Sequence, residues 1–590
     1  MCGIAGIMTI NGAQPDSVAL DRLTDALAHR GPDGRGKHLS GDVGMVQTRL
    51  AIIDLKTGDQ PIYLPSFDQS MHAALVANGE IYNYIELRDE LPQTTFSTET
   101  DSELPLHLYS KYGLSFASYL RGMYAIAIHD IKENQLILTR DRFGIKPLYY
   151  CETDKGFVFA SEASAIIDTG LIRAKINGER RNELMQLQFT TGEQTVFRGI
   201  NRLRPGETIV VKGGKIVSSF HTSALPKVKP KKTREVIALE EIDIALTDSI
   251  SVHQRSDVPY GLFFSGGIDS SVLIAMMSRL NDRPIKALTA GFSGISSHDE
   301  RTHARRVASA VGAAHIEVEF SERDFLSLLP KIANAVDDPT ADYACLPTFK
   351  LAARARAEGL KVVFSGEGGD ELFGGYGRYR HVNRPWPFVK PMRRKGIFHD
   401  LDVLYDNSSD WRSGFAASEK EASEYERNSL QIAQAIDFSD WLPADLLTKL
   451  DRCLMAHGVE GRVPFLDPVM IRAAYCLPDK LKIKNGKGKW LLRRWLEINL
   501  PIARPYDVKR GFTVPVGEWI SIYAKQLAPL VASQPGIKEI CRPGSVEFLF
   551  SGHGKQIEKA QWTILFYALW HQAHIMLRPS EGNIFDALSV

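Results

Sequence analysis

The second residue of the chain, Cys2, is the strongest candidate for catalysis in the sequence. If Met1 is removed, Cys2 carries a thiol and a free α-amine on the same carbon atom. A free thiol has a pKa of about 8.5 and an α-amine one of about 7.7–8.0, so the amine can accept the thiol proton near neutral pH. One residue then supplies both nucleophile and base, which is the chemistry of an N-terminal nucleophile. Taken alone, the motif does not favour this interpretation over a chance cysteine.

A second candidate site lies at residues 265–271, Ser-Gly-Gly-Ile-Asp-Ser-Ser, between an apolar strand predicted at 259–264 and a helix predicted at 270–280. Glycines let the backbone approach a ligand closely, and a helix N-terminus offers unpaired N–H groups and a positive dipole end. The segment therefore predicts a cradle for phosphate, although it lacks the Gly-Lys-Ser/Thr ending of a Walker loop. The structural alternative is an ordinary turn capped by Asp269 or Ser270.

A third candidate site follows the strand predicted at 360–364. It reads Ser-Gly-Glu-Gly-Gly-Asp-Glu at 365–371 and continues to Gly-Gly-Tyr at 374–376. Its carboxylates suit magnesium or an amine held near phosphate. Because ligands bind beyond the carboxyl ends of parallel strands, we expect both loops to share one site. Lys487, Lys489 and Arg493 follow on a segment predicted to be helical, and Lys487 is expected to solvate the surface.

Length and composition limit the class of protein. A chain of 590 residues is too long for one core and predicts at least two domains. A net charge of +1 gives no general electrostatic case for nucleic acid or a membrane surface. No apolar run approaches the roughly 20 residues of a membrane span, and the N-terminus lacks a signal-peptide layout. Six scattered cysteines without a CxxC pair argue against a zinc site or a disulfide framework. We expect a cytoplasmic protein that binds small molecules.

Two regions with different patterns must position these residues. Short strand-like runs at 44–46, 72–76, 124–128, 135–138 and 207–212 predict an α+β domain over residues 2–222. The Pro- and Lys-rich segment 223–236 predicts a solvated linker rather than a nucleic-acid patch. From 237 to 590, strands at 259–264, 286–292, 315–320 and 360–364 alternate with helices, which predicts a parallel sheet wrapped by helices. Residues 562–570 predict a core helix, and no role is assigned to 379–440 or to the chain beyond 530.

Taken together, these motifs resemble those of glutamine-hydrolysing asparagine synthetases, and the resemblance covers nearly the whole chain. That family joins a class II glutamine amidotransferase to an N-type ATP pyrophosphatase domain. The resemblance implies an N-terminal αββα sandwich of the Ntn type and a C-terminal HUP-like α/β domain with extra helices. The matching segments are MCGIAGI (1–7), HRGPD (29–33), RLAIIDL (49–55), GDQP (58–61), NGEIYNY (78–84), RDRFGIKPLYY (140–150), SEASAI (161–166), SGGIDSS (265–271), SGEGGDELFGGY (365–376) and GVEGRVPFLD (458–467).

For the first domain, the resemblance implies that Cys2 attacks the side-chain carbonyl of glutamine with its own α-amine as base. The side chain of Asn78 and the backbone N–H of Gly79 would form the oxyanion hole, which stabilises charge that appears only in the tetrahedral intermediate. Arg49 and Asp101 would hold the α-carboxylate and α-amine of glutamine. The remaining residues implied to line that site are Leu50, Ile52, Ile53 and Glu80.

For the second domain, the resemblance implies adenylation of the aspartate β-carboxylate by ATP and Mg²⁺, followed by attack of ammonia and release of AMP and pyrophosphate. Glu367 would act at the acyl-adenylate step, and Asp370 and Lys489 would handle aspartate or pyrophosphate. Asp269 would also hold the magnesium ion. The implied nucleotide contacts are Phe264, Ser265, Gly266, Gly267, Asp269, Ser270, Ala290, Ser365 and Gly366.

Three alternatives stay open at this point. The same chemistry could act on another carboxylate, such as a peptide, an antibiotic precursor or a glycan sugar acid. A non-catalytic binding protein on this scaffold is disfavoured because it has no physical need for the intact set of candidate residues, and a β-lactam-forming synthetase is disfavoured because it does not require Cys2. Ammonia as the working nitrogen donor and a homodimer also stay open. One departure from the family is Ser-Phe-His at 219–221, where an aromatic Tyr-Trp pair is common.

Overall fold

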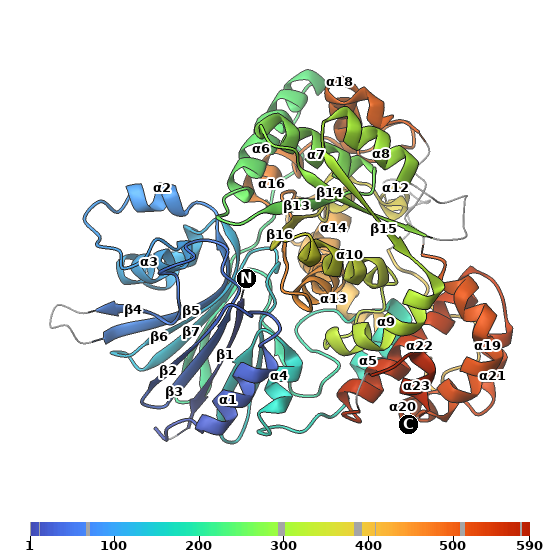
Figure 1. Cartoon of the computed structure of the whole chain (residues 1–590), viewed down its shortest axis with the longest axis horizontal. Helices are drawn as coiled ribbons and strands as arrows, with labels where there is room; N and C mark the ends of the chain where they lie inside the picture. The colour runs from blue at the N-terminus through green and yellow to red at the C-terminus, as the bar shows by residue number, and fades with distance from the viewer. Residues whose placement is uncertain are drawn as a thin grey trace.

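The computed structural model describes residues 2–10, 12–65, 71–292, 301–382, 392–407, 409–507, 514–578 and 581–589. Met1, on whose removal the prediction for Cys2 depends, lies outside these ranges. A strand-rich domain built from the N-terminal third of the chain lies beside a larger, mostly helical domain (Figure 1). The two-domain prediction is therefore confirmed.

The N-terminal domain consists of two six-stranded sheets. One sheet has the order β10 (Asn201–Arg202), β8 (Tyr149–Glu152), β9 (Gly156–Ala160), β1 (Cys2–Thr9), β3 (Val43–Arg49) and β2 (Gly34–Ser40). The other has the order β12 (Lys215–His221), β11 (Glu207–Lys212), β7 (Gln135–Arg140), β6 (Gly122–Asp130), β5 (Met71–Ile81) and β4 (Ile62–Pro65). The paired strands within both sheets are antiparallel.

The positions of the apolar residues along the strands explain how the two sheets and the covering helices stack. In β5, Ala74 and Val76 face the core between the sheets, whereas Leu75 packs on the opposite face with residues of α3 (Leu104–Tyr112). Side chains alternate across a strand, so a sheet covered on both faces needs apolar residues at successive positions. Helices α1 (Ser17–Ala26) and α4 (Ala163–Asp168) cover the other sheet. The predicted αββα sandwich is confirmed.

The C-terminal domain contains one five-stranded parallel sheet. Its order is β15 (Ala314–Phe320), β14 (Lys286–Phe292), β13 (Tyr260–Phe263), β16 (Val362–Phe364) and β17 (Glu460–Arg462). The four predicted strands are present. Strand β17 was not predicted because Glu-Gly-Arg has no apolar run. The chain adds β14 and β15 on one side of β13 and β16 and β17 on the other, so the switch point of the sheet lies between β13 and β16.

Helices surround this sheet and form the rest of the domain (Figure 1). The buried helix α22 confirms the prediction of a core helix at 562–570. No helix in the described ranges is long and apolar enough to cross a membrane. The remaining α-helices are α2 (Tyr84–Asp89), α5 (Gly178–Leu187), α6 (Glu235–His253), α7 (Ile268–Leu280), α8 (Arg301–Ala310), α9 (Glu322–Ala335), α10 (Cys345–Ala357), α11 (Gly369–Phe373), α12 (Gly377–Val382), α13 (Ser413–Ser423), α14 (Ser429–Ile436), α15 (Thr448–Met455), α16 (Pro468–Ala474), α17 (Asp479–Lys482), α18 (Trp490–Asn499), α19 (Val516–Ser533), α20 (Pro535–Ile540), α21 (Ser545–Ser551), α22 (Lys555–His574) and α23 (Ile584–Leu588).

Two connecting segments depart from regular α-helix and strand. The segment 222–234 has neither helix nor strand, yet it is not free in solvent. Leu225 is buried, and the carbonyl oxygens of Pro226 and Val228 accept hydrogen bonds from Arg427 and Gln431. The second feature is an 11-residue π-helix, Asp437–Leu447, which runs directly from α14 into α15.

Candidate active site

The candidate nucleophile starts a central strand of the first sheet. Cys2 of β1 is paired with Arg49 of β3, and only 7% of Cys2 is exposed. Its backbone N–H donates to Oδ1 of Asn78 at 3.0 Å, and Nε2 of Gln47 lies 2.9 Å from its Sγ. Burial raises the pKa of the Cys2 thiol. The thiol therefore needs a nearby base to become a nucleophile, and Gln47 cannot serve as one.

Two potential hydrogen-bond donors lie next to Cys2 on β5. Asn78 is fully buried, and its Nδ2 has no hydrogen-bond partner within the described residues. Leaving a buried donor unpaired costs about 1–3 kcal/mol. The next residue, Gly79, has a φ of +155°, and a Cβ there would lie 2.0 Å from the carbonyl oxygen of Met123, so only glycine fits. A free side-chain amide beside a glycine N–H is the arrangement expected of an oxyanion hole.

The residues expected to bind glutamine surround this strand end but are not all in contact. Nη1 of Arg49 pairs with Asp59 at 2.8 Å, and no contact in the described ranges joins Arg49 to Asp101. Asp101 is buried and accepts the N–H of Ile81 at 2.6 Å, and burial raises its pKa. Leu50, Ile52 and Ile53 are buried.

Glu80, which is expected to line the glutamine site, also contacts the second domain. It pairs with Arg462 of β17 at 3.3 Å, and burial together with Glu460 and Asp101 raises its pKa. This side chain therefore joins the two domains.

The first glycine-rich loop lies at the carboxyl end of β13. Gly267 is the N-cap of α7, and no side chain caps the helix. Neither Asp269 nor Ser270 is the N-cap, although Ser270 donates a hydrogen bond to the carbonyl oxygen of Gly267. Instead, Oγ of Ser265 accepts the N–H of Gly267 and lies 3.2 Å from Oγ of Ser270. The first N–H groups of α7 point out of the sheet edge, where an anion is favoured.

The second loop packs directly against the first, as expected. It follows β16, the neighbour of β13, and starts with Ser365. A Cβ at Gly366 would lie 3.0 Å from Cβ of Asp269, and one at Gly369 would lie 2.5 Å from its Oδ1. These glycines let two loops meet in the crevice at the switch point. Phe264 and Ala290 are buried at the ends of the adjacent strands.

Lys489 connects the two loops. Its Nζ pairs with Oδ1 of Asp370 at 2.7 Å and with Asp269, and the side chain is almost fully buried. Burial lowers the pKa of Lys489, but the two carboxylates outweigh burial and hold it above its usual value. The helical position predicted for Lys487 and Lys489 is wrong, because both precede α18 and Lys489 is its N-cap at a φ of +57°. Lys487 is exposed, as expected.

The candidate acid Glu367 has a cationic neighbour that the sequence analysis missed. Lys449 of α15 is buried, pairs with Asp342 at 2.8 Å and lies within the electrostatic field of Glu367. Ser365 donates a hydrogen bond to Glu367. The segment 448–455, Thr-Lys-Leu-Asp-Arg-Cys-Leu-Met, contains three charged residues, so its pattern does not distinguish Lys449 from a surface lysine.

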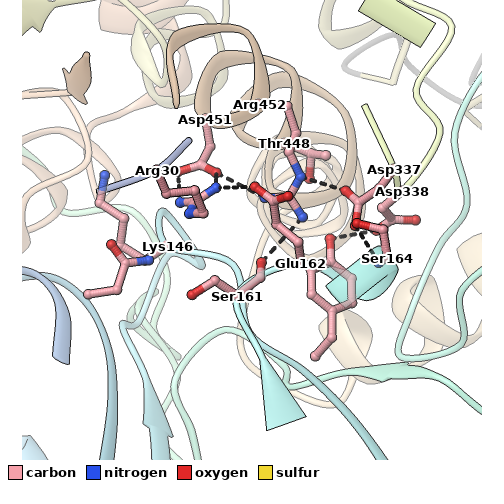
Figure 2. A network of polar contacts seen from close by, with 12 residues as sticks. Arg30, Lys146, Ser161, Glu162, Ser164, Asp337, Asp338, Thr448, Asp451 and Arg452 are labelled. Atoms are coloured by element: carbon pink, nitrogen blue, oxygen red, sulfur yellow. Dashed lines mark hydrogen bonds and ion pairs between the residues drawn. The ribbon is translucent and has the colours of Figure 1, made fainter. Parts of the chain in front are cut away.

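A buried ionic network joins the nucleophile to the second domain (Figure 2). Nε of Arg30 donates to the carbonyl oxygen of Cys2 at 3.3 Å, while its Nη1 pairs with Glu162 at 2.7 Å and with Asp451 of α15 at 2.8 Å. Arg452 in turn pairs with Asp451, and with Asp337 at 2.6 Å. Removing one member of such a buried network leaves an uncompensated charge. Arg30 and Glu162 lie in the matching segments HRGPD and SEASAI, whereas Asp337, Asp451 and Arg452 lie outside the matching segments.

The donor set fits a metal that arrives with a phosphate ligand. No group of three or more His, Cys, Asp or Glu side chains in the described ranges could hold a metal by itself. Magnesium, however, is usually held by one or two carboxylates together with substrate phosphates. Asp269 and Asp370, which face each other across Lys489, supply that pair.

Comparison with known proteins agrees with this geometry. Residues 241–572 match the asparagine synthase family and residues 1–221 match a glutamine amidotransferase domain. The chain is 31% identical over 634 residues to "Asparagine synthetase [glutamine-hydrolyzing] 1" of Bacillus subtilis, covering 98% of each chain. It is 28% identical over 555 residues to "Asparagine synthetase B [glutamine-hydrolyzing]" of Escherichia coli, covering 90% of this chain and 86% of the relative.

A third relative carries a different name. The chain is 29% identical over 574 residues to "Amidase chry2" of Gibberella zeae, covering 83% of this chain and 84% of that protein. The family match spans more than half of the chain, and the Bacillus subtilis relative matches it from end to end. The asparagine synthase family uses ATP. The chain therefore belongs to the glutamine-hydrolysing asparagine synthetase family of glutamine-dependent ligases.

Proposed function

We propose that this protein converts L-aspartate into L-asparagine, with glutamine as nitrogen donor and ATP cleaved to AMP and pyrophosphate. The observation that carries the proposal is the pairing of two sites in one chain. One presents a buried thiol beside an unpaired amide donor, and the other presents two glycine-rich loops at the switch point of a parallel sheet. The six cysteines, all unpaired, suit the reducing cytoplasm that a free nucleophilic thiol requires.

In the first half-reaction, Cys2 attacks the side-chain carbonyl of glutamine after its thiol proton passes to its own α-amine. Arg49 and Asp101 hold the two ends of the amino acid, and Leu50, Ile52 and Ile53 shape the site. Negative charge develops on the carbonyl oxygen, where Nδ2 of Asn78 and the N–H of Gly79 receive it. Loss of ammonia leaves a thioester, which water hydrolyses to glutamate. The unpaired state of Asn78 Nδ2 supports this role.

In the second half-reaction, the aspartate β-carboxylate attacks the α-phosphorus of ATP to give β-aspartyl-AMP and pyrophosphate. The uncapped N-terminus of α7 and the side chains of Ser265 and Ser270 suit the phosphates. Magnesium would offset phosphate charge, with Asp269 and Asp370 as its protein ligands. Lys489 is placed to move from these carboxylates to the departing pyrophosphate. Phe264, Ala290, Ser365 and Gly366 lie where the nucleotide would contact the strand ends.

Ammonia then attacks the activated carbonyl carbon, forms asparagine and expels AMP. The acyl-adenylate must be kept from water, because it hydrolyses readily. We assign Glu367 to this step, since it follows β16 at the sheet edge, accepts a hydrogen bond from Ser365 and interacts electrostatically with Lys449. The buried network of Figure 2 keeps the two domains in fixed contact between the sites.

The direct test is product analysis with purified protein, glutamine, aspartate and Mg-ATP, in which asparagine, glutamate and AMP are measured together. Asparagine formed in equal amount to AMP is the expected result. Glutamate without asparagine or AMP would overturn aspartate as the acceptor and leave only the glutaminase half standing.

The name of the Gibberella zeae relative gives a specific reason to include other acceptors in this assay. AMP release that depends on a peptide or a sugar acid, and not on aspartate, would assign the same chemistry to that acceptor.

A further inference from the structure

A cavity of about 390 Å³ lies between the N-terminal domain and the helical segment 414–444. Its walls include residues 140, 142, 180, 191–194 and 202–205, the start of the linker, α13 and the π-helix. None of the residues assigned above to catalysis lines it. Small-molecule sites occur preferentially between domains and have volumes of about 300–1,000 Å³. The cavity is therefore large enough for a metabolite of its own.

The lining of the cavity is rich in arginine. It contains six arginines and three acidic side chains, and three of the arginines, Arg180, Arg202 and Arg204, form ion pairs with Glu183, Asp338 and Glu193. Arg142 and Arg427 donate hydrogen bonds to backbone carbonyl oxygens, and neither forms an ion pair within the described residues. Hydrogen bonds to neutral carbonyls leave a guanidinium charge uncompensated. Of the acids, Asp440 is buried, and burial raises its pKa to about 7, so its negative charge is only partly present at neutral pH.

One arginine also has an unused donor. Nη1 of Arg180 pairs with Glu183 at 2.7 Å, but its buried Nε has no hydrogen-bond partner within the described residues. The cavity also presents apolar surface from Leu225, Ala422 and Phe438. Guanidinium groups bind carboxylate and phosphate through paired hydrogen bonds. The lining therefore suits a small molecule with a carboxylate or phosphate on an apolar body.

The π-helix connects this cavity to the segment that follows the second glycine-rich loop. Phe438 and Asp440 line the cavity. On another face of the same helix, Asp437 accepts hydrogen bonds from Nε of Arg378 at 2.8 Å and from the hydroxyl of Tyr379 at 2.5 Å. These two residues follow the second glycine-rich loop by a few positions.

The helix that continues from the π-helix reaches both catalytic centres. Lys449 of α15 lies in the field of Glu367, and Asp451 pairs with Arg30, which donates to the carbonyl oxygen of Cys2. A continuous segment whose residues line the cavity and interact with both sites is able to carry energetic coupling between them. A π-helix is also a rare geometry that is frequent at functional sites.

We propose that the cavity binds a small organic anion, and that its occupancy changes the affinity of the synthetase site for its acceptor through the segment 437–455. Arg142 and Arg180 bind the anionic group, and Phe438 and Leu225 contact the apolar body. The second half of the proposal rests on the proposed function, because it takes aspartate as the acceptor. The first half, anion binding, does not depend on activity.

Anion binding is tested with the fluorescent dye anilinonaphthalene sulfonate, an aromatic anion, titrated into the full-length protein. We expect Arg142→Gln to weaken dye binding about tenfold, the loss expected for one charge-assisted hydrogen bond. Arg173→Gln, at an exposed arginine outside the cavity, is the matched control and should bind like the unmodified protein. Equal dye affinity in both variants would overturn the assignment of the cavity.

Competition with the dye shows whether the cavity prefers a carboxylate or a phosphate. Succinate and glycerol phosphate are added to the dye complex as probes for a carboxylate and a phosphate. If one probe displaces the dye from the unmodified protein but not from Arg142→Gln, the cavity prefers the anionic group of that probe. Failure of both to displace the dye contradicts an anion site.

Coupling is tested by filling the cavity. Ala417 of α13 lines it and is exposed, so Ala417→Trp should fold, whereas Ala416→Trp on the same helix points outside the lining set and is the control. We expect Ala417→Trp to change the KM for aspartate at least about fivefold, a typical allosteric coupling. If dye binding is lost in Ala417→Trp while the KM for aspartate stays constant, the cavity is a binding site and the proposed coupling is wrong.

Discussion

The two candidate sites of this chain differ in whether their polar side chains are paired. The site around Cys2 is built on the strands β1 and β5 and keeps one donor, Nδ2 of Asn78, without a partner. The site around Lys489 is built on loops beyond the strand ends, and its charged side chains are paired with one another. One site therefore carries an unsatisfied neutral group, whereas the other carries satisfied charges.

The difference follows from the charge that each site must bind. In glutamine hydrolysis the negative charge exists only in the tetrahedral intermediate, so a donor must be in place and unused before it appears. Phosphates and carboxylates carry permanent charge, and they can displace an internal ion pair on binding. Strands suit the first task because they fix a donor rigidly, and loops suit the second because Lys489, Asp269 and Asp370 must exchange partners.

The largest effect is expected from removing the nucleophile. Cys2→Ala should abolish glutamine-dependent product formation, because no other thiol lies beside the Asn78 amide in the described residues. Product formation from ammonium chloride should stay within about twofold, since the synthetase loops are untouched. The measurement is asparagine and AMP with each nitrogen source. Loss of the ammonia-dependent activity in a folded variant would contradict the division of labour between the domains.

The next effect concerns the unused donor. Asn78→Ala should lower kcat for glutamine hydrolysis about 10²–10³-fold, the loss typical of one oxyanion-hole donor. Asn78 also accepts the N–H of Cys2, so Asn78→Asp serves as the control that keeps an acceptor and removes the donor. Both variants should be similarly impaired. Near-normal glutaminase activity in Asn78→Asp would mean that Asn78 only positions Cys2.

A third, smaller loss is expected at the paired charges of the other site. Lys489→Met should lower AMP-forming activity about 10²-fold with either nitrogen donor. The variant removes the cation that Asp269 and Asp370 share, and the same cation no longer stabilises the leaving pyrophosphate. Glutamine hydrolysis without aspartate should be unchanged. Lys487→Met, two residues away on the surface, is the control. Equal losses in the two variants would show that Lys489 has no special role.

How much could be predicted from the sequence depends on whether a feature leaves a local sequence pattern. Glycine-rich loops, apolar strands and the terminal cysteine carry local signals, so the parallel sheet and the αββα sandwich were predicted. The helical position of Lys489 was wrong because a left-handed N-cap at lysine has no sequence signature. Lys449 and Arg30 were missed, because the two partners of a buried ion pair can lie far apart in the chain, as Arg30 and Asp451 do. The roles of the site residues stay predictions until the variants are measured.

The smallest expected effect is a pH dependence of stability, which concerns a side chain of the second site. Burial, reinforced by Asp370, raises the pKa of Glu371 to about 7, whereas an unfolded glutamate titrates at about 4.3. Because the folded state binds this proton more tightly, the favourable contribution of Glu371 is complete below about pH 4 and is lost as the pH rises through 7. Glu371→Gln removes that loss and keeps an acceptor for the hydroxyl of Tyr376.

The apparent Tm of Glu371→Gln should therefore exceed that of the unmodified protein at pH 8 and approach it at pH 5. The difference corresponds to about 1–3 kcal/mol at the higher pH, since one unit of pKa is worth about 1.4 kcal/mol. Glu319→Gln, at an exposed glutamate of β15, is the matched control and should show no such trend. A difference that does not vary with pH would mean that Glu371 is ionised in the folded protein, and that the charges of this site are less completely paired than the structure indicates.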